Sequence, residues 1–486
     1  TAYIFWLAFA EMLFYISGFI VQAAAGHILG PAQYGIFGLI VTLTILIASL
    51  IGNGIPIAMS KFLSSEFKRK PELVSVIKRK GAIAQFILMA IVTAVFFFAS
   101  PLIAQLLHDP SLTGLLRIST FIIPCFAADA FYFYYYTGIH QFNMQSLLKS
   151  IRSVLRVLLI VGLGYFMSLE GFITGYIYVP LAVFIVALLV DQFVYTKRFP
   201  KESTLDFPIK KLIFYALPIT GFLLLYQAMI SLDLFAVKSI LQDDYQTGLF
   251  NGAFTVAQIP NYLFYALTIV LLPVVSHSTA NEEKQKTTAA ITKALRTMYI
   301  LLVAVVALII GYAKPLMIFF FGSQYAAGSN ALELMAFGVG LLTLFYVMSF
   351  AFQGAGLVKL PLRIAFFGML ANATLNVVLI RSMGILGAGL ATSITAIFVT
   401  IALFYFLKKE FDSYLKFATI AKTLFAGLII LFLSLFLPGS HLLFIISGAI
   451  LFALYLAILY LLKELNKEDL LFFLSMLPGR RKKHST

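Results

Sequence analysis

The sequence predicts an all-α integral membrane protein, in which 14 transmembrane helices form two parallel-related six-helix lobes and a C-terminal helix pair. Three observations predict this class. The 486 residues are 61% hydrophobic and 11% charged, and the mean hydropathy is +0.99, which lies far outside the range of soluble proteins. Apolar stretches of about 20 residues recur along the chain, each long enough to cross a bilayer. A segment of about 200 residues is present twice.

The apolar stretches fall into two sets of six and one final pair. The first set lies near residues 3–27, 36–60, 82–107, 114–139, 147–167 and 171–195. The second set lies near residues 212–238, 247–276, 290–312, 328–353, 363–381 and 385–407. The final pair lies near residues 417–437 and 441–462. Little sequence remains outside these stretches, so we expect no soluble domain of useful size.

The duplication is carried by four pairs of segments that match in the same order, at offsets of roughly 213 to 220 positions. These pairs are 29–37 with 242–250, 99–103 with 313–317, 152–160 with 372–380, and 170–171 with 386–387. Six helices is an even number, so both copies insert in the same orientation and are related by an axis along the membrane normal. We expect lobes at 1–200 and 201–412, then an extra helix pair and a basic cytoplasmic tail at 413–486. Such duplicated bundles are typical of transporters.

The positions of lysine and arginine predict the orientation in the membrane. When alternate connections are assigned to the cytoplasm, 31 of the 35 basic residues fall on that side. The positive-inside bias therefore predicts a multi-pass protein of the cell membrane with both termini in the cytoplasm. The net charge of +15 is explained by this topology, and it does not indicate nucleic-acid binding, which needs basic residues gathered on a soluble face.

Redox, metal and enzyme chemistry are not indicated. The single cysteine, Cys125, lies within an apolar stretch and cannot form an internal disulfide or a metal cluster. A membrane enzyme such as a sugar polymerase or ligase needs a catalytic constellation in a sizeable outer loop. The predicted outer connections are short, and we interpret His108 beside Asp109 as a loop feature. We therefore expect no metal, no cofactor and no enzymatic activity.

Polar residues at bilayer depth are costly, so each is a candidate site. Glu11, Tyr15 and Gln22 share one face of the first predicted helix, and such a polar stripe suits a water-filled cavity. Asp129 lies near the middle of the fourth predicted helix, with Tyr136 on its side at helical spacing. We expect Asp129 in the cavity, where it serves polarity or ion coupling, and Tyr136 either against a sugar ring or in an interfacial aromatic belt.

Arg152 and Arg156 are four residues apart on one face of the fifth helix, and Asn372 and Asn376 correspond to them in the second copy. Two guanidinium groups in a cavity suit bidentate binding of a phosphate or diphosphate, whereas the asparagines suit hydrogen bonds to hydroxyls. The alternative is that the arginines extend to the lipid headgroups.

Four further charged residues are candidates for ion pairs or gates. Asp233 and Lys238 lie about one turn apart in the seventh helix. They suit an ion pair in the second lobe, or a gate at the outer mouth, with Asp233 also a candidate for ion coupling. Arg117 and Glu333 occupy corresponding places in the two copies, where they suit a pair across the lobes or a surface position.

Three motifs carry a resemblance to a known family: Leu29-Gly30 with Tyr34-Gly35, the Asp233 helix followed by Gly248, and Asn372-x-x-x-Asn376 followed by Gly384-x-x-Gly387-Ala388-Gly389-x-Ala391-Thr392. With them the chain resembles the polysaccharide and oligosaccharide flippases of the multidrug/oligosaccharidyl-lipid/polysaccharide exporter superfamily. The resemblance implies a V-shaped pair of lobes that moves a polyprenyl-diphosphate-linked oligosaccharide from the inner to the outer leaflet by alternating access.

The leading hypothesis is therefore a lipid-linked oligosaccharide flippase for cell-surface polysaccharide biosynthesis, with proton or sodium coupling and no nucleic-acid partner. A multidrug or cation antiporter of the same superfamily is one alternative. A lipid II flippase is another; lipid II flippases share these motifs but typically have arginine in the first helix, where this chain has Glu11.

Overall fold

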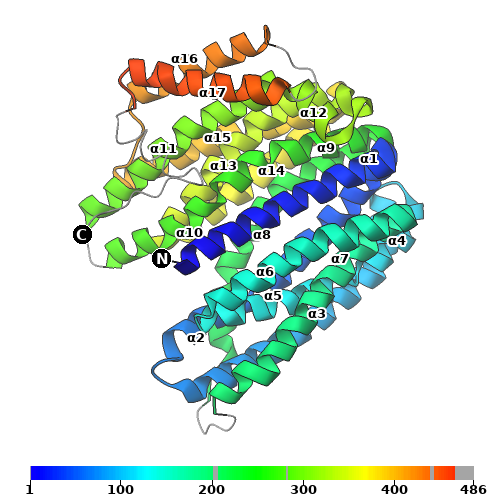
Figure 1. Ribbon diagram of the computed structural model, residues 1–486, viewed down its shortest axis with the longest axis vertical. Helices are drawn as coiled ribbons and strands as arrows, with labels where there is room; N and C mark the ends of the chain where they lie inside the picture. Colours follow the sequence, from blue (N-terminus) through cyan, green and yellow to red (C-terminus); the bar gives the residue numbers. More distant parts are fainter. Residues whose placement is uncertain (1, 201–205, 281–282, 438–442, 466–486) are drawn as a thin grey trace.

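The computed structural model describes residues 2–200, 206–280, 283–437 and 443–465, and every regular element among them is helical (Figure 1). The helices of the first copy are α1 (Ala2–Asn53), α2 (Ile55–Glu66), α3 (Pro71–Leu106), α4 (Thr113–Ser119), α5 (Ile122–Gly138), α6 (Phe142–Leu155) and α7 (Gly162–Val190). Short elements join them: the 3-10 helices η1 (Pro110–Leu112) and η4 (Thr196–Arg198), and the π-helices η2 (Arg156–Val161) and η3 (Asp191–Tyr195).

The second copy comprises α8 (Ile209–Leu241), α9 (Asp244–Ala257), α10 (Ile259–Ala280), α11 (Lys284–Gly311), α12 (Ala313–Phe321), α13 (Ser329–Gly354), α14 (Lys359–Met383) and α15 (Ile385–Phe411). The 3-10 helix η5 (Ser323–Gly328) lies between α12 and α13. The last two helices are α16 (Phe417–Ser434) and α17 (Leu443–Leu461). The predicted basic tail beyond residue 465 lies outside the described residues.

The described residues contain 11 helical stretches that are long and apolar enough to cross a membrane. The 52 residues of α1 would measure about 78 Å if straight, more than twice the hydrocarbon thickness. The helix turns back at Gly30, whose φ of 70° and ψ of 170° suit glycine, and Pro31 follows. Ser168 interrupts α7 in the same way, so the stretches that contain α1 and α7 each hold two spans. Helices α9 and α10 together form one further span that is not among the 11. The described helices therefore account for all 14 predicted spans.

The backbone repeats as the sequence does. Three positive-φ turn positions of the first copy recur in the second: His108 with Gly322, His140 with Gly356, and Ser168 with Gly384. Their offsets of 214, 216 and 216 positions lie within the range of the matched segments. At Ser168 and Gly384 even the ψ angles agree, at −134° and −139°. The predicted duplication of a six-helix unit is confirmed at the level of the backbone.

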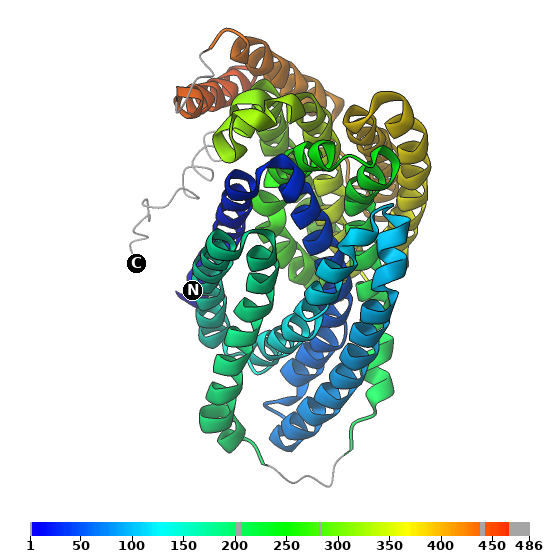
Figure 2. The same ribbon diagram turned by 90° about the vertical axis from the view of Figure 1, so that its right-hand side faces the viewer.

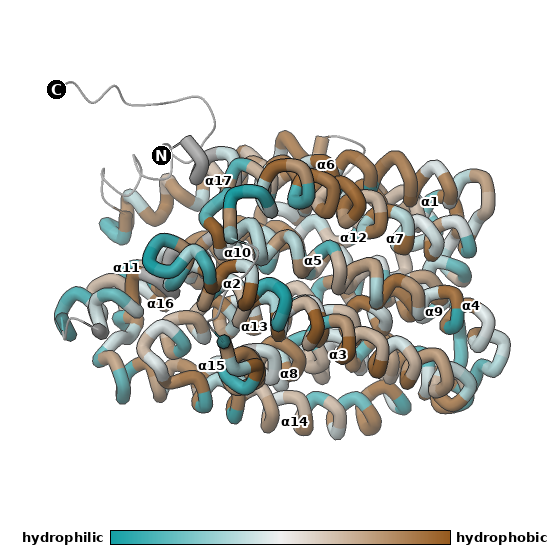
Figure 3. Tube along the Cα trace, turned by 90° about the horizontal axis from the view of Figure 1, so that it is seen from below, coloured by the Kyte–Doolittle hydropathy of each residue, from teal (hydrophilic) through white to brown (hydrophobic). Residues whose placement is uncertain are grey.

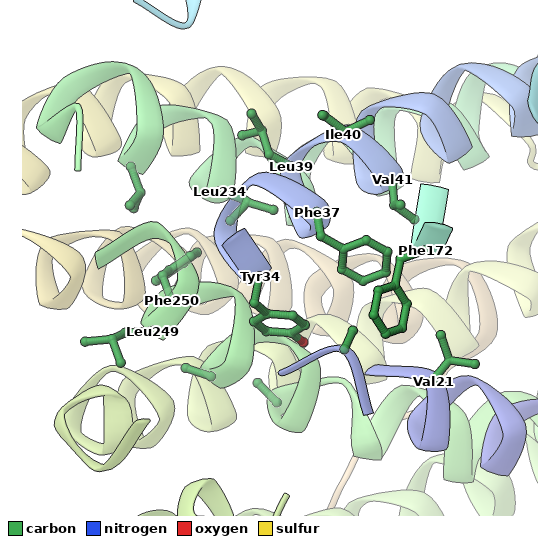
Figure 4. Close-up of a cluster of buried hydrophobic side chains, with 14 of the residues drawn as sticks. Val21, Tyr34, Phe37, Leu39, Ile40, Val41, Phe172, Leu234, Leu249 and Phe250 are labelled. Atoms are coloured by element: carbon green, nitrogen blue, oxygen red, sulfur yellow. The ribbon is translucent and has the colours of Figure 1, made fainter. Parts of the chain in front are cut away.

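The buried cores show how the two lobes meet (Figures 1 and 2). One core joins both lobes at the end where α1 turns at Gly30, which we call the Gly30 end. Figure 4 shows part of it, with Tyr34 and Phe37 of the first lobe near Leu234 and Phe250 of the second. Away from this end each lobe has a core of its own. The lobes are thus packed together at one end and separately packed at the other.

Helix α8 belongs to both lobes. Leu212 and Ala216 pack in the core of the first lobe, whereas Phe222 and Ile230 pack in that of the second. Pro218 lies between the two parts and removes a helix hydrogen bond there. The lobe boundary at residues 200/201 stays a prediction, and the first turns of α8 extend beyond it onto the first lobe.

The extra pair α16–α17 packs on α11 and α12 at one edge of the molecule (Figure 1). Glu464, just after α17, joins the end of this helix to α11 and to the start of α16, because its carboxylate accepts hydrogen bonds from Arg296 Nε (3.2 Å) and Thr419 Oγ1 (2.8 Å). Large apolar side chains face outward elsewhere, as on α3, where Phe86, Val95 and Phe98 are 64%, 62% and 79% exposed. Figure 3 shows such hydrophobic segments along the outer helices. The surface is that of a protein surrounded by lipid.

Candidate cavity between the lobes

A cavity of about 310 Å³ lies between the lobes, near the middle of the first half of α1. Its lining comes mostly from the first lobe, and the second lobe contributes Thr255 and Tyr262. The lining residues are Phe14, Tyr15, Gly18, Phe19, Gln22, Ile45, Ile122, Phe126, Arg152, Arg156, Ile160, Tyr176, Val179, Pro180, Thr255 and Tyr262. The cavity is therefore mostly apolar and aromatic, with a few polar groups and two arginines, as is usual for ligand sites.

The two arginines come from the junction of α6 and the π-helix η2, which begins at Arg156. Short π-helical segments often occur at functional sites. The Arg156 guanidinium lies over the rings of Phe14 (5.0 Å) and Tyr176 (5.8 Å). Gly18 leaves room for it, because a Cβ atom there would lie 2.8 Å from Nη1 of Arg156. Among the described residues, no carboxylate lies within ion-pair distance of Arg156.

The other charges of the first lobe are paired beside the cavity. Arg152 Nη1 lies 2.7 Å from Asp129 Oδ2, and Lys149 donates a hydrogen bond to Glu11. The structure thus brings together Glu11, Asp129, Arg152 and Arg156. Neither carboxylate lines the cavity itself, contrary to the expectation for Asp129 and Glu11, because each is turned toward a basic side chain of α6. Lys149 is a partner that the sequence reasoning missed, and its signal was its spacing three and seven residues before the two arginines.

Hydroxyl and amide groups close the cavity toward the Gly30 end. The Tyr34 hydroxyl donates to Gln22 Oε1 (2.9 Å) and lies 3.2 Å from Thr255 Oγ1 of the second lobe. At the opposite side, the Tyr15 ring stacks on Tyr262 of the second lobe with centroids 4.8 Å apart. Both boundaries are contacts between lobes, so relative movement of the lobes opens them.

The lobes approach most closely where α1 crosses α9 at the Gly30 end. A Cβ atom on Gly35 would lie 2.6 Å from Asp244 O, and one on Gly248 would overlap Pro31 O. Gly35 and Gly248 are equivalent in the repeat, as are Pro31 and Asp244, each pair at an offset of 213. The crossing therefore has approximate two-fold symmetry, and glycine at both positions permits backbone contact.

An ion pair joins the lobes at the same end. Lys238 Nζ lies 2.9 Å from Asp109 Oδ2 of the first lobe and 2.5 Å from Asp244 Oδ1 of the second. Burial alone would raise the pKa of Asp109, but hydrogen bonds from Ser111 and Lys238 lower it overall, so this carboxylate stays charged at neutral pH. Lys238 thus joins the two lobes at the Gly30 end, and its role as a gate stays a prediction. The suggested pair with Asp233 is not formed.

Asp233 instead forms a buried network inside the second lobe. Its carboxylate accepts hydrogen bonds from Asn372 Nδ2 (3.0 Å), Asn376 Nδ2 (2.6 Å) and the Thr392 hydroxyl. Both asparagines are at most 1% exposed. The two asparagines therefore do not line the cavity, contrary to expectation, because their amides donate to Asp233 inside the second lobe.

Two other expectations are narrowed by the structure: Tyr136 does not line the cavity, and Arg117 and Glu333 occupy the surface positions that were the alternative to a pair. Tyr136 is fully buried and donates to Ala187 O (2.7 Å), so it does not contact a ligand in the cavity. Arg117 lies over the Phe97 ring at 5.3 Å, and Glu333 is exposed. Within the described part of the chain these two do not pair with each other.

Two repeated lobes that enclose a cavity with two arginines, in a bundle of membrane-spanning helices, define a transporter of the alternating-access type. The chain belongs to the polysaccharide biosynthesis protein family, whose family model matches residues 1–279. It is 24% identical to the probable low-salt glycan biosynthesis flippase Agl15 of Haloferax volcanii over 160 residues. This aligned segment covers 33% of this chain and 34% of that protein.

Solved structures share the fold. The lipid II flippase MurJ in an inward closed conformation superposes with a TM-score of 0.68 at 16% identity, over 93% of this chain and 98% of that one. An inward-facing multidrug resistance MATE family transporter of the MOP superfamily superposes with a TM-score of 0.69 at 17% identity, over 83% of this chain and 94% of that one. These likenesses concern the fold, and both neighbours are transport proteins.

Proposed function

We propose that the protein is a flippase that moves a polyprenyl-diphosphate-linked oligosaccharide from the inner to the outer leaflet of the cell membrane. One observation carries the proposal: the cavity between the lobes contains a guanidinium group, that of Arg156, for which the described residues provide no carboxylate partner. An unpaired cation at bilayer depth is costly unless an anion binds it. The family membership and the similarity to a glycan flippase support a sugar-bearing anion.

The chemistry of the lining suits such a headgroup. Arginine binds phosphate oxygens bidentately, and the aromatic rings of Phe14, Tyr15 and Tyr262 provide faces for the apolar side of a sugar ring. Gln22 and Thr255 offer hydrogen bonds to hydroxyls. A cavity of 310 Å³ holds the diphosphate and its neighbouring groups, while the polyprenyl chain stays in lipid. Transport in this scheme needs no bond to break, so the protein is not an enzyme.

The orientation follows from charge. Basic residues concentrate at the end opposite Gly30, so this end faces the cytoplasm by the positive-inside bias. Both termini then lie on the cytoplasmic side. The shared core and the Lys238 pair are then at the outer face, so the lobes are closed toward the outside. This arrangement suits loading from the inner leaflet.

We expect purified protein in liposomes to move a fluorescent polyprenyl-diphosphate sugar between leaflets, because the hydrated cationic cavity lowers the cost of bringing the headgroup into the bilayer. Movement is measured by chemical quenching of the outer-leaflet dye. Liposomes with heat-inactivated protein are the control. Export of cationic drugs without movement of the lipid would contradict the proposal and support a multidrug antiporter.

Asp233 is the proposed coupling-ion site. It is fully buried, and among the described residues no basic side chain pairs with it. A buried carboxylate of this kind takes up a proton or a cation. Asn376 Oδ1 has no hydrogen-bond partner within the described part of the chain. Rotation of that amide would present an oxygen to a hard cation beside Asp233.

We expect sodium to stabilise the wild-type protein against heating relative to choline, by up to about 2.7 kcal/mol at a hundredfold excess over Kd. Asp233→Asn should abolish this shift, and Glu333→Gln, an exposed carboxylate in the same lobe, should retain it. Thermal unfolding in detergent measures both. A stability that depends on pH but not on sodium would assign a proton to the site, and an unchanged sodium shift in Asp233→Asn would contradict it.

A further inference from the structure

Three basic residues follow one another along α6 and η2, and they differ in how their charges are balanced. Lys149 is paired with Glu11 and Arg152 with Asp129. Arg156 has no carboxylate within ion-pair distance among the described residues. Without a ligand, the two arginines of the cavity therefore present only one uncompensated positive charge.

The two ion pairs beside the cavity are not alike. Lys149 donates a hydrogen bond to Glu11. Arg152 Nη1 lies 2.7 Å from Asp129 Oδ2, yet that oxygen is buried without a hydrogen bond of good geometry. The Arg152–Asp129 contact is thus a contact of charges in poor alignment, and such a contact exchanges more easily than an aligned one.

Arg152 also lines the cavity, so a ligand bound there can contact its guanidinium group. Its guanidinium lies over the rings of Phe14 (5.4 Å) and Phe126 (5.1 Å), and all three residues line the cavity. Asp129 is 4% exposed and does not line the cavity. The guanidinium therefore separates the buried carboxylate from the space that a ligand occupies.

We propose that an anionic diphosphate headgroup takes Arg152 from Asp129 and that Asp129 binds a proton in exchange; this inference rests on the function proposed above. The contact between the guanidinium and the carboxylate breaks, a contact with a phosphate oxygen forms, and a proton from water joins the Asp129 carboxylate. A buried carboxylate that loses its cation is strongly disfavoured. Two negative charges of a diphosphate diester then meet two arginines, and Asp129 is neutral.

The surroundings of Asp129 are consistent with this exchange. From α6 it is faced by Arg152 and, further away, by Lys149, which remains balanced by Glu11 of α1. Tyr176 of α7 lies beyond Arg152, and its hydroxyl is buried without a partner. Among the described residues, α2 and α3 place no charged side chain in ion-pair contact with Asp129. Once Arg152 turns to a ligand, no other cation directly replaces it.

The test counts protons. The probe is a farnesyl diphosphate that carries one glucose on its terminal phosphate, because its two charges do not change near neutral pH. Calorimetric titration in detergent at pH 7, in buffers of different ionisation enthalpy, gives the protons taken up per probe bound. We expect uptake approaching one proton for the wild type and for Asp191→Asn, which makes the same substitution in the same lobe at an ion pair with Lys78 outside the cavity. Asp129→Asn should bind the probe at least as tightly, with no proton uptake.

The wild type provides a second readout that does not depend on any variant folding. Where one proton is taken up, the Kd for the probe falls about tenfold for each unit decrease in pH. Binding with a Kd that is independent of pH, or unchanged uptake in Asp129→Asn, would overturn the exchange and leave the proposed function intact. Failure of the wild type to bind the probe would overturn the proposed function itself.

Discussion

Arg156→Ala should abolish translocation while the protein remains folded. Arg156 is the cavity guanidinium without a carboxylate partner among the described residues, so its loss leaves no charge unpaired in the empty protein. Loss of two charge-assisted hydrogen bonds to the diphosphate removes about 3–6 kcal/mol, which weakens binding by a hundredfold or more. The measurement is movement of a fluorescent polyprenyl-diphosphate sugar in liposomes, beside thermal unfolding of the same preparation.

The matched control is Arg117→Ala. Arg117 is an arginine of the same lobe that lies over Phe97, outside the cavity, so its removal should leave transport within about twofold of wild type. Arg156→Lys should recover part of the activity, since lysine keeps the charge but not the bidentate geometry. Gly18→Ala should reduce transport as well, because the added methyl group would lie against the Arg156 guanidinium. Full transport by Arg156→Ala would remove the central claim.

The sequence was sufficient for the features that follow from hydropathy and repetition. The span near 147–167 and the turn that follows it appear as α6, η2 and the break at Ser168, because bilayer thickness limits span length. The four-residue spacing of Arg152 and Arg156 placed them on one helix face, and both line the cavity. In such cases a local pattern determines the position of a residue.

The sequence was insufficient where a side chain had a choice of partners. The sequence match paired Asn372 and Asn376 with the two arginines of the cavity, whereas the backbone turns on either side, at an offset of 216, pair Arg156 with Asn372. Both asparagines turn toward Asp233. A buried carboxylate without hydrogen-bond donors is strongly destabilising, so the amides bind it in preference to lining the cavity. The packing of α8 against α14, which brings these groups together, cannot be predicted from either segment alone. Lys238 likewise joins Asp109, 129 residues away, in preference to Asp233 one turn before it.

Gly248→Ala should stall the transport cycle by opening the outer face. Gly248 and Gly35 are repeat-related glycines at the crossing of α9 and α1, and a Cβ atom on Gly248 would overlap the carbonyl oxygen of Pro31. Backbone cannot yield as a side chain does, so the added methyl group should destabilise the closed outer face by about 1–3 kcal/mol. We expect transport to fall roughly tenfold or more.

A cysteine accessibility experiment separates this effect from general damage. In a Cys125→Ser background, Gln22→Cys places a thiol in the cavity, behind the Tyr34 and Thr255 contacts. An impermeant maleimide added outside should label it faster when Gly248→Ala is present. Gly252→Ala, one turn further along α9, is the control, because its Cβ would meet only side-chain atoms such as Met317 Cε at 3.2 Å. Equal labelling in both variants would show that the α1–α9 crossing does not control the outer face. A selective rise with Gly248→Ala would show that close backbone contact between the two copies keeps that face shut, since the two substitutions add the same methyl group to the same helix.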